Sequence, residues 1–146
     1  MRLIYYAMVA PILVFSGIVY FLVTTGALGE PDYSIAVLLQ QIAMITVPVC
    51  LAAGYFVFKA GLQKIESKLP LDQKLQKYFV LILIRASIFE AAFFFCVVAT
   101  ILTRELLFLT AAPIVLFLFL LLRPNGTSIS ADLSLPPEES KLVHDY

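Results

Sequence analysis

Four long apolar segments, over residues 3–23, 35–58, 78–102 and 106–122, restrict what this chain can fold into. A bilayer core requires about 20 apolar residues per helix, with a range of roughly 17 to 25, and each segment meets that length. Helices of a water-soluble protein normally keep a polar face, which these segments lack. The first segment is too long for the apolar region of a signal peptide, which has about 7–15 residues. The sequence therefore predicts an all-α membrane protein with four transmembrane helices.

The composition supports this class and disfavours others. Of the 146 residues, 62% are hydrophobic and 14% charged, whereas a soluble domain is nearer half apolar and a quarter charged. The net charge of zero disfavours a nucleic-acid partner, because phosphate binding needs a basic surface. Cys50 and Cys96 lie inside apolar segments, and the single histidine is His144. These residues offer no metal set and no nucleophile–base pair, so we expect no enzyme activity, no metal, no cofactor and two free thiols.

The placement of lysine and arginine predicts the orientation in the membrane. The connection over 24–34 contains neither residue, whereas the connection over 59–77 contains five lysines. Cytoplasmic loops of multi-pass proteins carry the excess of these residues. We therefore expect an up-and-down bundle over 1–122, with both termini and the tail, 123–146, in the cytoplasm. Arg104, in the turn before the fourth segment, argues against this orientation. The lysines expected to contact lipid headgroups are Lys59, Lys64, Lys68, Lys74 and Lys77.

The middle connection is predicted to continue the two helices that it joins. Polar residues interleave with Leu62, Ile65 and Leu69 at helical spacing until Pro70 breaks the pattern. Helices two and three should therefore project from the membrane as a short cytoplasmic helical hairpin. In the tail, a proline followed by two acids at 137–139 predicts the start of a short helix. Apolar tail residues with docking capacity are Ile129, Leu133, Leu135, Leu142 and Val143.

The third segment carries the residue most open to a functional role, Glu90. It lies about 20 Å along the helix from Lys77, near the bilayer midplane. An acid there costs on the order of 2.5–3.5 kcal/mol and should face protein. Matching depths across an antiparallel helix pair places Thr46 and Pro48 at its level. We therefore expect an intramembrane polar site, for which the candidate residues are Glu90, Arg85, Ser87, Thr46, Gln41 and Gln40.

Three roles for Glu90 follow from the residues. It could be a protonated, hydrogen-bonded acid that fixes helix packing, a proton or ion site in a transport path, or the partner of Arg85 in a neighbouring subunit. Within one chain the two residues lie about 140° apart around the helix, so Arg85 should instead extend to the cytoplasmic interface. The function hypotheses are a non-enzymatic accessory or assembly subunit of an oligomer or larger membrane complex, and a small proton-coupled transporter or channel component using Glu90.

The C-terminal half has a recognisable layout. A helix with an arginine and a glutamate at 85–94 is followed by the turn at Arg104, an apolar helix ending at 122–124 and the tail sequence at 132–139. This layout resembles a group of small, uncharacterised four-helix bacterial inner-membrane proteins. The resemblance implies a bacterial origin, and hence a location in the bacterial inner membrane, and it implies no particular activity.

Overall fold

The computed structural model describes residues 2–30, 33–66, 69–122 and 126–143, and all regular secondary structure among them is helical. In chain order the helices are α1 (Arg2–Thr24), α2 (Ala36–Gln63), α3 (Leu71–Thr103), the 3-10 helix η1 (Leu106–Thr110), α4 (Ala111–Leu121), α5 (Gly126–Asp132) and α6 (Pro137–Val143). Helices α1, α2 and α3 are long and apolar enough to cross a membrane, and a fourth is added if η1, α4 and α5 count as one broken span. The predicted all-helical class is confirmed, and three or four candidate membrane spans are found where four were predicted.

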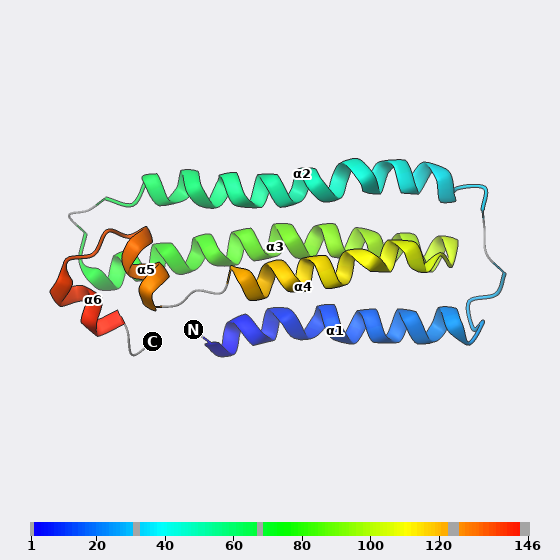
Figure 1. Ribbon diagram of the computed structural model, residues 1–146, viewed down its shortest axis with the longest axis horizontal. Helices are drawn as coiled ribbons and strands as arrows, with labels where there is room; N and C mark the ends of the chain where they lie inside the picture. The colour runs from blue at the N-terminus through cyan, green and yellow to red at the C-terminus, as the bar shows by residue number, and fades with distance from the viewer. Residues whose placement is uncertain (1, 31–32, 67–68, 123–125, 144–146) are drawn as a thin grey trace.

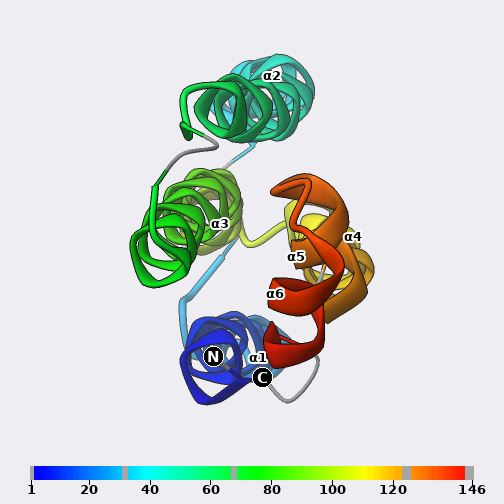
Figure 2. The ribbon, with the colours of Figure 1, turned by 90° about the vertical axis from the view of Figure 1, so that its left-hand side faces the viewer.

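The long helices lie side by side, with α3 at the centre (Figure 1). Helix α3 packs against α1, α2 and α4, and α1 also packs against α4. Helix α2 packs chiefly on α3, and the end view places it on the far side of the bundle from α1 (Figure 2). The described helices therefore differ from a closed ring in which every helix has two neighbours, because α2 is held mainly from one side.

A glycine allows α2 and α3 to approach closely. A Cβ atom added at Gly54 would lie 2.6 Å from the Phe89 ring, so only glycine fits beneath that ring without a shift. The same ring packs edge-to-face on Phe119 of α4, with centroids 6.2 Å apart. Phe89 thus joins three helices at one level. Beside it, Phe93 and Ile12 contribute to the largest buried apolar cluster, which is built mainly from α1, α3 and α4.

Helices α2 and α3 extend beyond their apolar segments. Helix α2 continues to Gln63 and α3 begins at Leu71, so both helices continue into the middle connection as predicted. Helix α2 nevertheless ends before Leu69, the last residue of the predicted helical pattern. With 33 residues, α3 is about 50 Å long, against about 30 Å for a bilayer core. The helix is therefore longer than a membrane crossing requires, and the tail covers its first turns.

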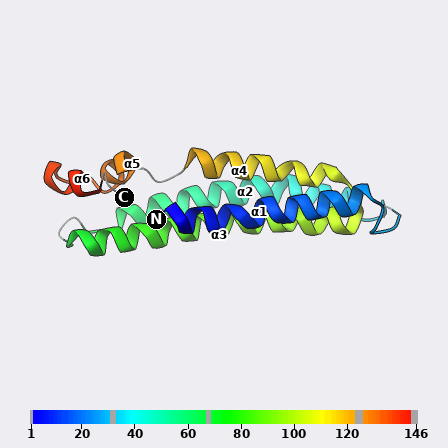
Figure 3. The same ribbon diagram turned by 90° about the horizontal axis from the view of Figure 1, so that it is seen from below.

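The tail folds back over the ends of α2 and α3 (Figures 1 and 3). Ile129 of α5 is 2% exposed and packs in a cluster that includes Tyr78. The Tyr78 hydroxyl donates to the Asp132 carboxylate at 2.9 Å, and the Lys74 ammonium pairs with the Glu139 carboxylate at 3.5 Å. The tail thus combines apolar docking with two polar contacts. The short helix predicted from the proline and two acids is α6, which confirms that prediction.

The fourth apolar segment is not the single continuous helix that we predicted over 106–122. It begins as the 3-10 helix η1 and becomes α-helical only in α4. Pro113 lies in the first turn of α4 and lacks the amide that would bond to the Leu109 carbonyl in a continuous helix. The proline is tolerated where it lies, because first-turn amides have no partner within their own helix.

At the end of the bundle away from the tail, Arg104 links the turn after α3 to the α1–α2 connection. It ends α3 in a left-handed conformation, with φ of 58°. Its Nε and Nη2 atoms donate to the Leu28 carbonyl, at 3.0 and 2.6 Å. Leu28 belongs to the α1–α2 connection. This contact therefore gives Arg104 a structural role at the end of the bundle where the predicted orientation would not favour an arginine.

Candidate functional site

Glu90 lies on the face of α3 that packs toward α1 and α4. Its neighbours one turn away, Ala86, Phe93 and Phe94, belong to or pack against the apolar cluster of those helices. Phe94 meets Phe15 of α1 edge-to-face, with centroids 5.3 Å apart. The Oε1 atom of Glu90 is buried and has no hydrogen-bond partner within the described part of the chain. Glu90 therefore contributes a buried polar atom to an apolar core.

The other candidate residues of the polar site lie on α2 and α3. Thr46, Gln40 and Gln41 belong to α2, and Ser87 is exposed on α3. Among residues 2–30, 33–66, 69–122 and 126–143, no side-chain hydrogen bond joins any of them to Glu90. Hydrogen bonds among the described residues therefore do not join these candidates to Glu90.

The rotation of α3 explains the difference from the sequence prediction. Depth matching paired Glu90 with Thr46 and Pro48, but depth does not determine which face of a helix meets its neighbour. Helix α2 packs on the face of α3 that carries Arg85 and Phe89. Glu90 lies five residues after Arg85 and thus about 140° around the helix, on the opposite flank.

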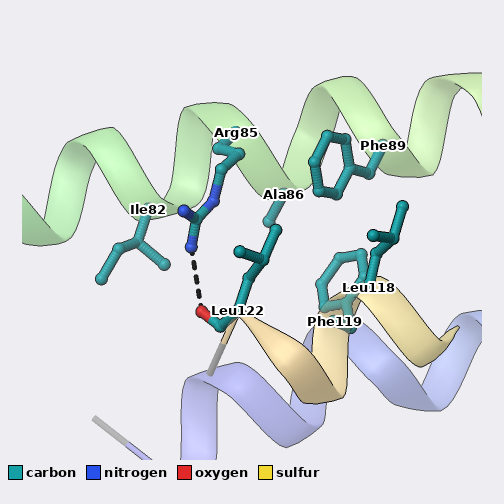
Figure 4. Close-up of a pocket in the computed structure, with 7 residues that line it drawn as sticks. All are labelled: Ile82, Arg85, Ala86, Phe89, Leu118, Phe119 and Leu122. Atoms are coloured by element: carbon teal, nitrogen blue, oxygen red, sulfur yellow. Dashed lines mark hydrogen bonds between the residues drawn. The ribbon is translucent and has the colours of Figure 1, made fainter. Parts of the chain in front are cut away.

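Arg85 fastens α4 to the pair formed by α2 and α3. Its guanidinium carbon lies 4.1 Å from the centroid of the Phe58 ring of α2. Its Nη2 atom donates to the carbonyl of Leu122, at the C-terminal end of α4, over 3.0 Å (Figure 4). The last carbonyls of a helix lack partners and carry partial negative charge, so a cation there is stabilising. Arg85 is 7% exposed and is therefore a packed residue of the bundle.

The five lysines predicted to contact headgroups have different surroundings. Lys59, Lys64 and Lys77 are exposed. Lys68 lies outside the described residues. Lys74 departs from the prediction: it is buried and pairs with Glu139, because α6 covers its side of α3.

A pocket of ≈ 270 Å³ opens beside Arg85 at the end of the bundle that carries the tail. Helices α2, α3 and α5 and the end of α4 provide its walls. Residues lining it include Tyr55, Phe58, Lys59, Tyr78, Arg85 and Asp132. The Lys59 ammonium lies 5.4 Å from the centroid of the Tyr55 ring, a cation–π distance. The pocket therefore combines two cations, aromatic rings and one carboxylate.

A wider groove of ≈ 440 Å³ lies between α2 and the η1–α4 segment. Its walls are mainly apolar and include Met44, Phe108 and Ile114, and Gln40 of the predicted polar site lies on its edge. The sequence analysis did not predict either space, because the pocket depends on how the tail docks and the groove on the gap beside α2. The helical spacing of Ile129 and Asp132 was the available signal that α5 has an inward face.

The possible chemistry is limited by these side chains. Cys50 and Cys96 are both free, as predicted. Where the structure describes the chain, no three His, Cys, Asp or Glu side chains lie close enough together to hold a metal ion. Comparison with known protein families, curated proteins and solved structures finds no match for the chain.

Proposed function

We propose that the chain is a non-enzymatic integral protein of the bacterial inner membrane, which serves as an accessory or assembly subunit of an oligomer or larger membrane complex. The observation that carries this proposal is the position of α2, which packs chiefly on α3. Membrane helices associate through close packing and interhelical hydrogen bonds. Helix α2 has such packing at Gly54 on one side, which leaves the opposite side available to another subunit.

The outward face of α2 supports this proposal. Ile45 and Phe56 are each 67% exposed, and because they are eleven residues apart they share one face to within about 20°. Gln41, one turn before Ile45, is also exposed. An amide in an apolar helix is stabilised by a hydrogen bond to another helix. A subunit docked on this face could provide that bond, whereas lipid tails could not.

The proposal includes the orientation with both termini and the α2–α3 connection in the cytoplasm. It is supported by the five lysines of that connection, because such residues concentrate in cytoplasmic loops. The start of α1, the α2–α3 connection and the tail helices lie at one end of the bundle (Figure 1). One compartment can therefore hold all three.

Site-specific photocrosslinking tests the proposed interface. A benzoylphenylalanine residue at position 45 or 56 should form a discrete adduct in intact cells, either with a second copy of this chain or with one other membrane protein. Leu13 of α1 is the matched control, because it is 55% exposed and lies on a different helix; we expect lipid adducts there. The absence of any protein adduct at both α2 positions would contradict the proposal.

A second candidate function is a small proton-coupled transporter or channel component that uses Glu90. It is favoured by the buried Oε1 atom, since a buried polar atom without a partner calls for an explanation. The apolar neighbours Ala86, Phe93 and Phe94 provide no side-chain relay beside it. The Glu90→Gln variant in liposomes separates the two functions, because a proton carrier must titrate and an amide cannot. Normal assembly with lost proton flux would favour transport.

A further inference from the structure

The pocket beside Arg85 and the apolar groove follow one another along the same seam between α2 and α4. Arg85 lines the pocket and Cys96 lines the groove. These α3 residues are eleven positions apart, so they share a face to within about 20° and are separated by about 16 Å. Met44 in the groove and Tyr55 in the pocket have the same spacing on α2. The two spaces therefore lie one after the other along the same side of α2 and α3, with the level of Phe89 between them.

The pocket end of this seam has an excess of positive charge. Lys59 and Arg85 face it together with one carboxylate, Asp132, which already accepts a hydrogen bond from Tyr78. The pocket lies where the apolar helix α4 ends, next to Leu122. Basic and aromatic side chains at the end of an apolar helix lie at headgroup depth in a membrane. An anionic group is the ligand that these charges favour.

The groove end is suited to hydrocarbon. Met44, Phe108 and Ile114 contribute apolar walls. The hydroxyl of Thr110 donates to the Leu107 carbonyl of its own turn at 2.6 Å, so it is already engaged within the chain. The groove lies further along α3 than the pocket, in the direction of the membrane interior. A chain attached to a group in the pocket would therefore extend into the groove.

We propose that this seam binds one anionic phospholipid, with its phosphate at Lys59 and Arg85 and an acyl chain between α2 and α4. This site is independent of the subunit role proposed above, because that role uses the outward face of α2. A zwitterionic lipid is disfavoured by the excess positive charge. A soluble phosphate would leave the apolar groove unused.

Tryptophan fluorescence with brominated lipids tests the proposal. The chain has no tryptophan, so Ile114→Trp introduces a single fluorophore into the groove, at a side chain that is 51% exposed. The full-length variant is reconstituted in phosphatidylcholine vesicles. A minor fraction of the lipid is brominated phosphatidylglycerol or, at the same fraction, brominated phosphatidylcholine. We expect the anionic lipid to quench more strongly. Leu107→Trp, also in the groove, is the second probe should the first variant fail to fold.

Paired charge variants separate the pocket from general surface charge. One lysine at an anionic surface contributes roughly five-fold in affinity. Lys59→Gln should therefore reduce the preference for phosphatidylglycerol about five-fold, and Lys59→Arg should retain it. Lys64→Gln removes the same charge five residues away, outside the pocket, and should leave the preference intact. A tryptophan at Leu13 on α1 should show no preference.

Three results would overturn the proposal. The first is equal quenching of the groove tryptophan by both brominated lipids. The second is an equal loss of preference in Lys59→Gln and Lys64→Gln, which would assign the effect to surface charge. The third is abolition of the preference by millimolar inorganic phosphate at constant ionic strength, which would assign the pocket to a soluble anion.

Discussion

Replacing Tyr78 by phenylalanine removes one hydroxyl group and leaves the ring in place. The ring is 2% exposed and packs in the cluster that holds α5, and its hydroxyl donates to Asp132 at 2.9 Å. The substitution therefore isolates the polar contribution to docking of the tail. The apolar contribution, including the burial of Ile129, is unchanged.

The magnitude follows from the kind of hydrogen bond that is lost. A bond to a charged group contributes about 1.5–3 kcal/mol. The Asp132 residue is exposed, so water can replace the lost donor and the lower limit applies. A loss of about 1.5 kcal/mol raises the undocked fraction of the tail roughly ten-fold.

Hydrogen exchange followed by mass spectrometry, on the protein in lipid nanodiscs, measures this change. Helix α5 has seven residues, and an isolated helix of that length is unstable in water, so its amides exchange when the tail undocks. We expect exchange in α5 to become about ten-fold faster in Tyr78→Phe, with α1 unchanged. Tyr20→Phe, at a tyrosine that is 56% exposed on α1, is the control. Unchanged α5 exchange in Tyr78→Phe would refute the role of this hydrogen bond.

Three further predictions concern the bundle itself. Glu90→Gln should preserve the fold, whereas Glu90→Lys should lower the melting temperature, because a charge near the midplane costs a few kcal/mol; equal melting temperatures would contradict this. Gly54→Val should destabilise the protein by about 1–3 kcal/mol, because the added atoms meet the buried Phe89 ring. Gly17→Ala is the control and should not destabilise the protein, because a Cβ atom there meets nothing within 4 Å. A membrane-impermeant thiol reagent should label Glu30→Cys from outside the cell and Lys64→Cys only after disruption, and the reverse pattern would overturn the orientation.

Features that depend on local sequence could be predicted. Apolar segment length located the three long helices, and the interleaved polar residues before Pro70 indicated that α2 continues past its apolar segment. The start of α6 followed from a proline and two acids in one turn. Cys50 and Cys96 are free thiols, as expected from their places in separate apolar segments. Each of these inferences uses either a chain length or neighbouring residues.

Features that depend on rotation and long-range docking could not be predicted. The sequence predicts how deep Glu90 lies in the membrane. It does not predict which face of α3 meets α2, because the close contact at Gly54 determines that. The burial of Lys74 requires a partner 65 positions later in the chain, which no local pattern indicates. Arg85 was expected at the interface, and its contact with the end of α4 depends on where that helix stops.

The most direct test of the proposed subunit role is the mass of the protein extracted from its own membrane with a styrene–maleic acid copolymer, which retains native lipid. Mass photometry combined with native mass spectrometry then counts the polypeptides in each particle. The account predicts particles that contain at least two polypeptides in fixed stoichiometry, with dissociation promoted by a bulky charged substitution at Ile45 on the outward face of α2. Particles that contain one copy of this chain and no other protein, at native expression level, would contradict it.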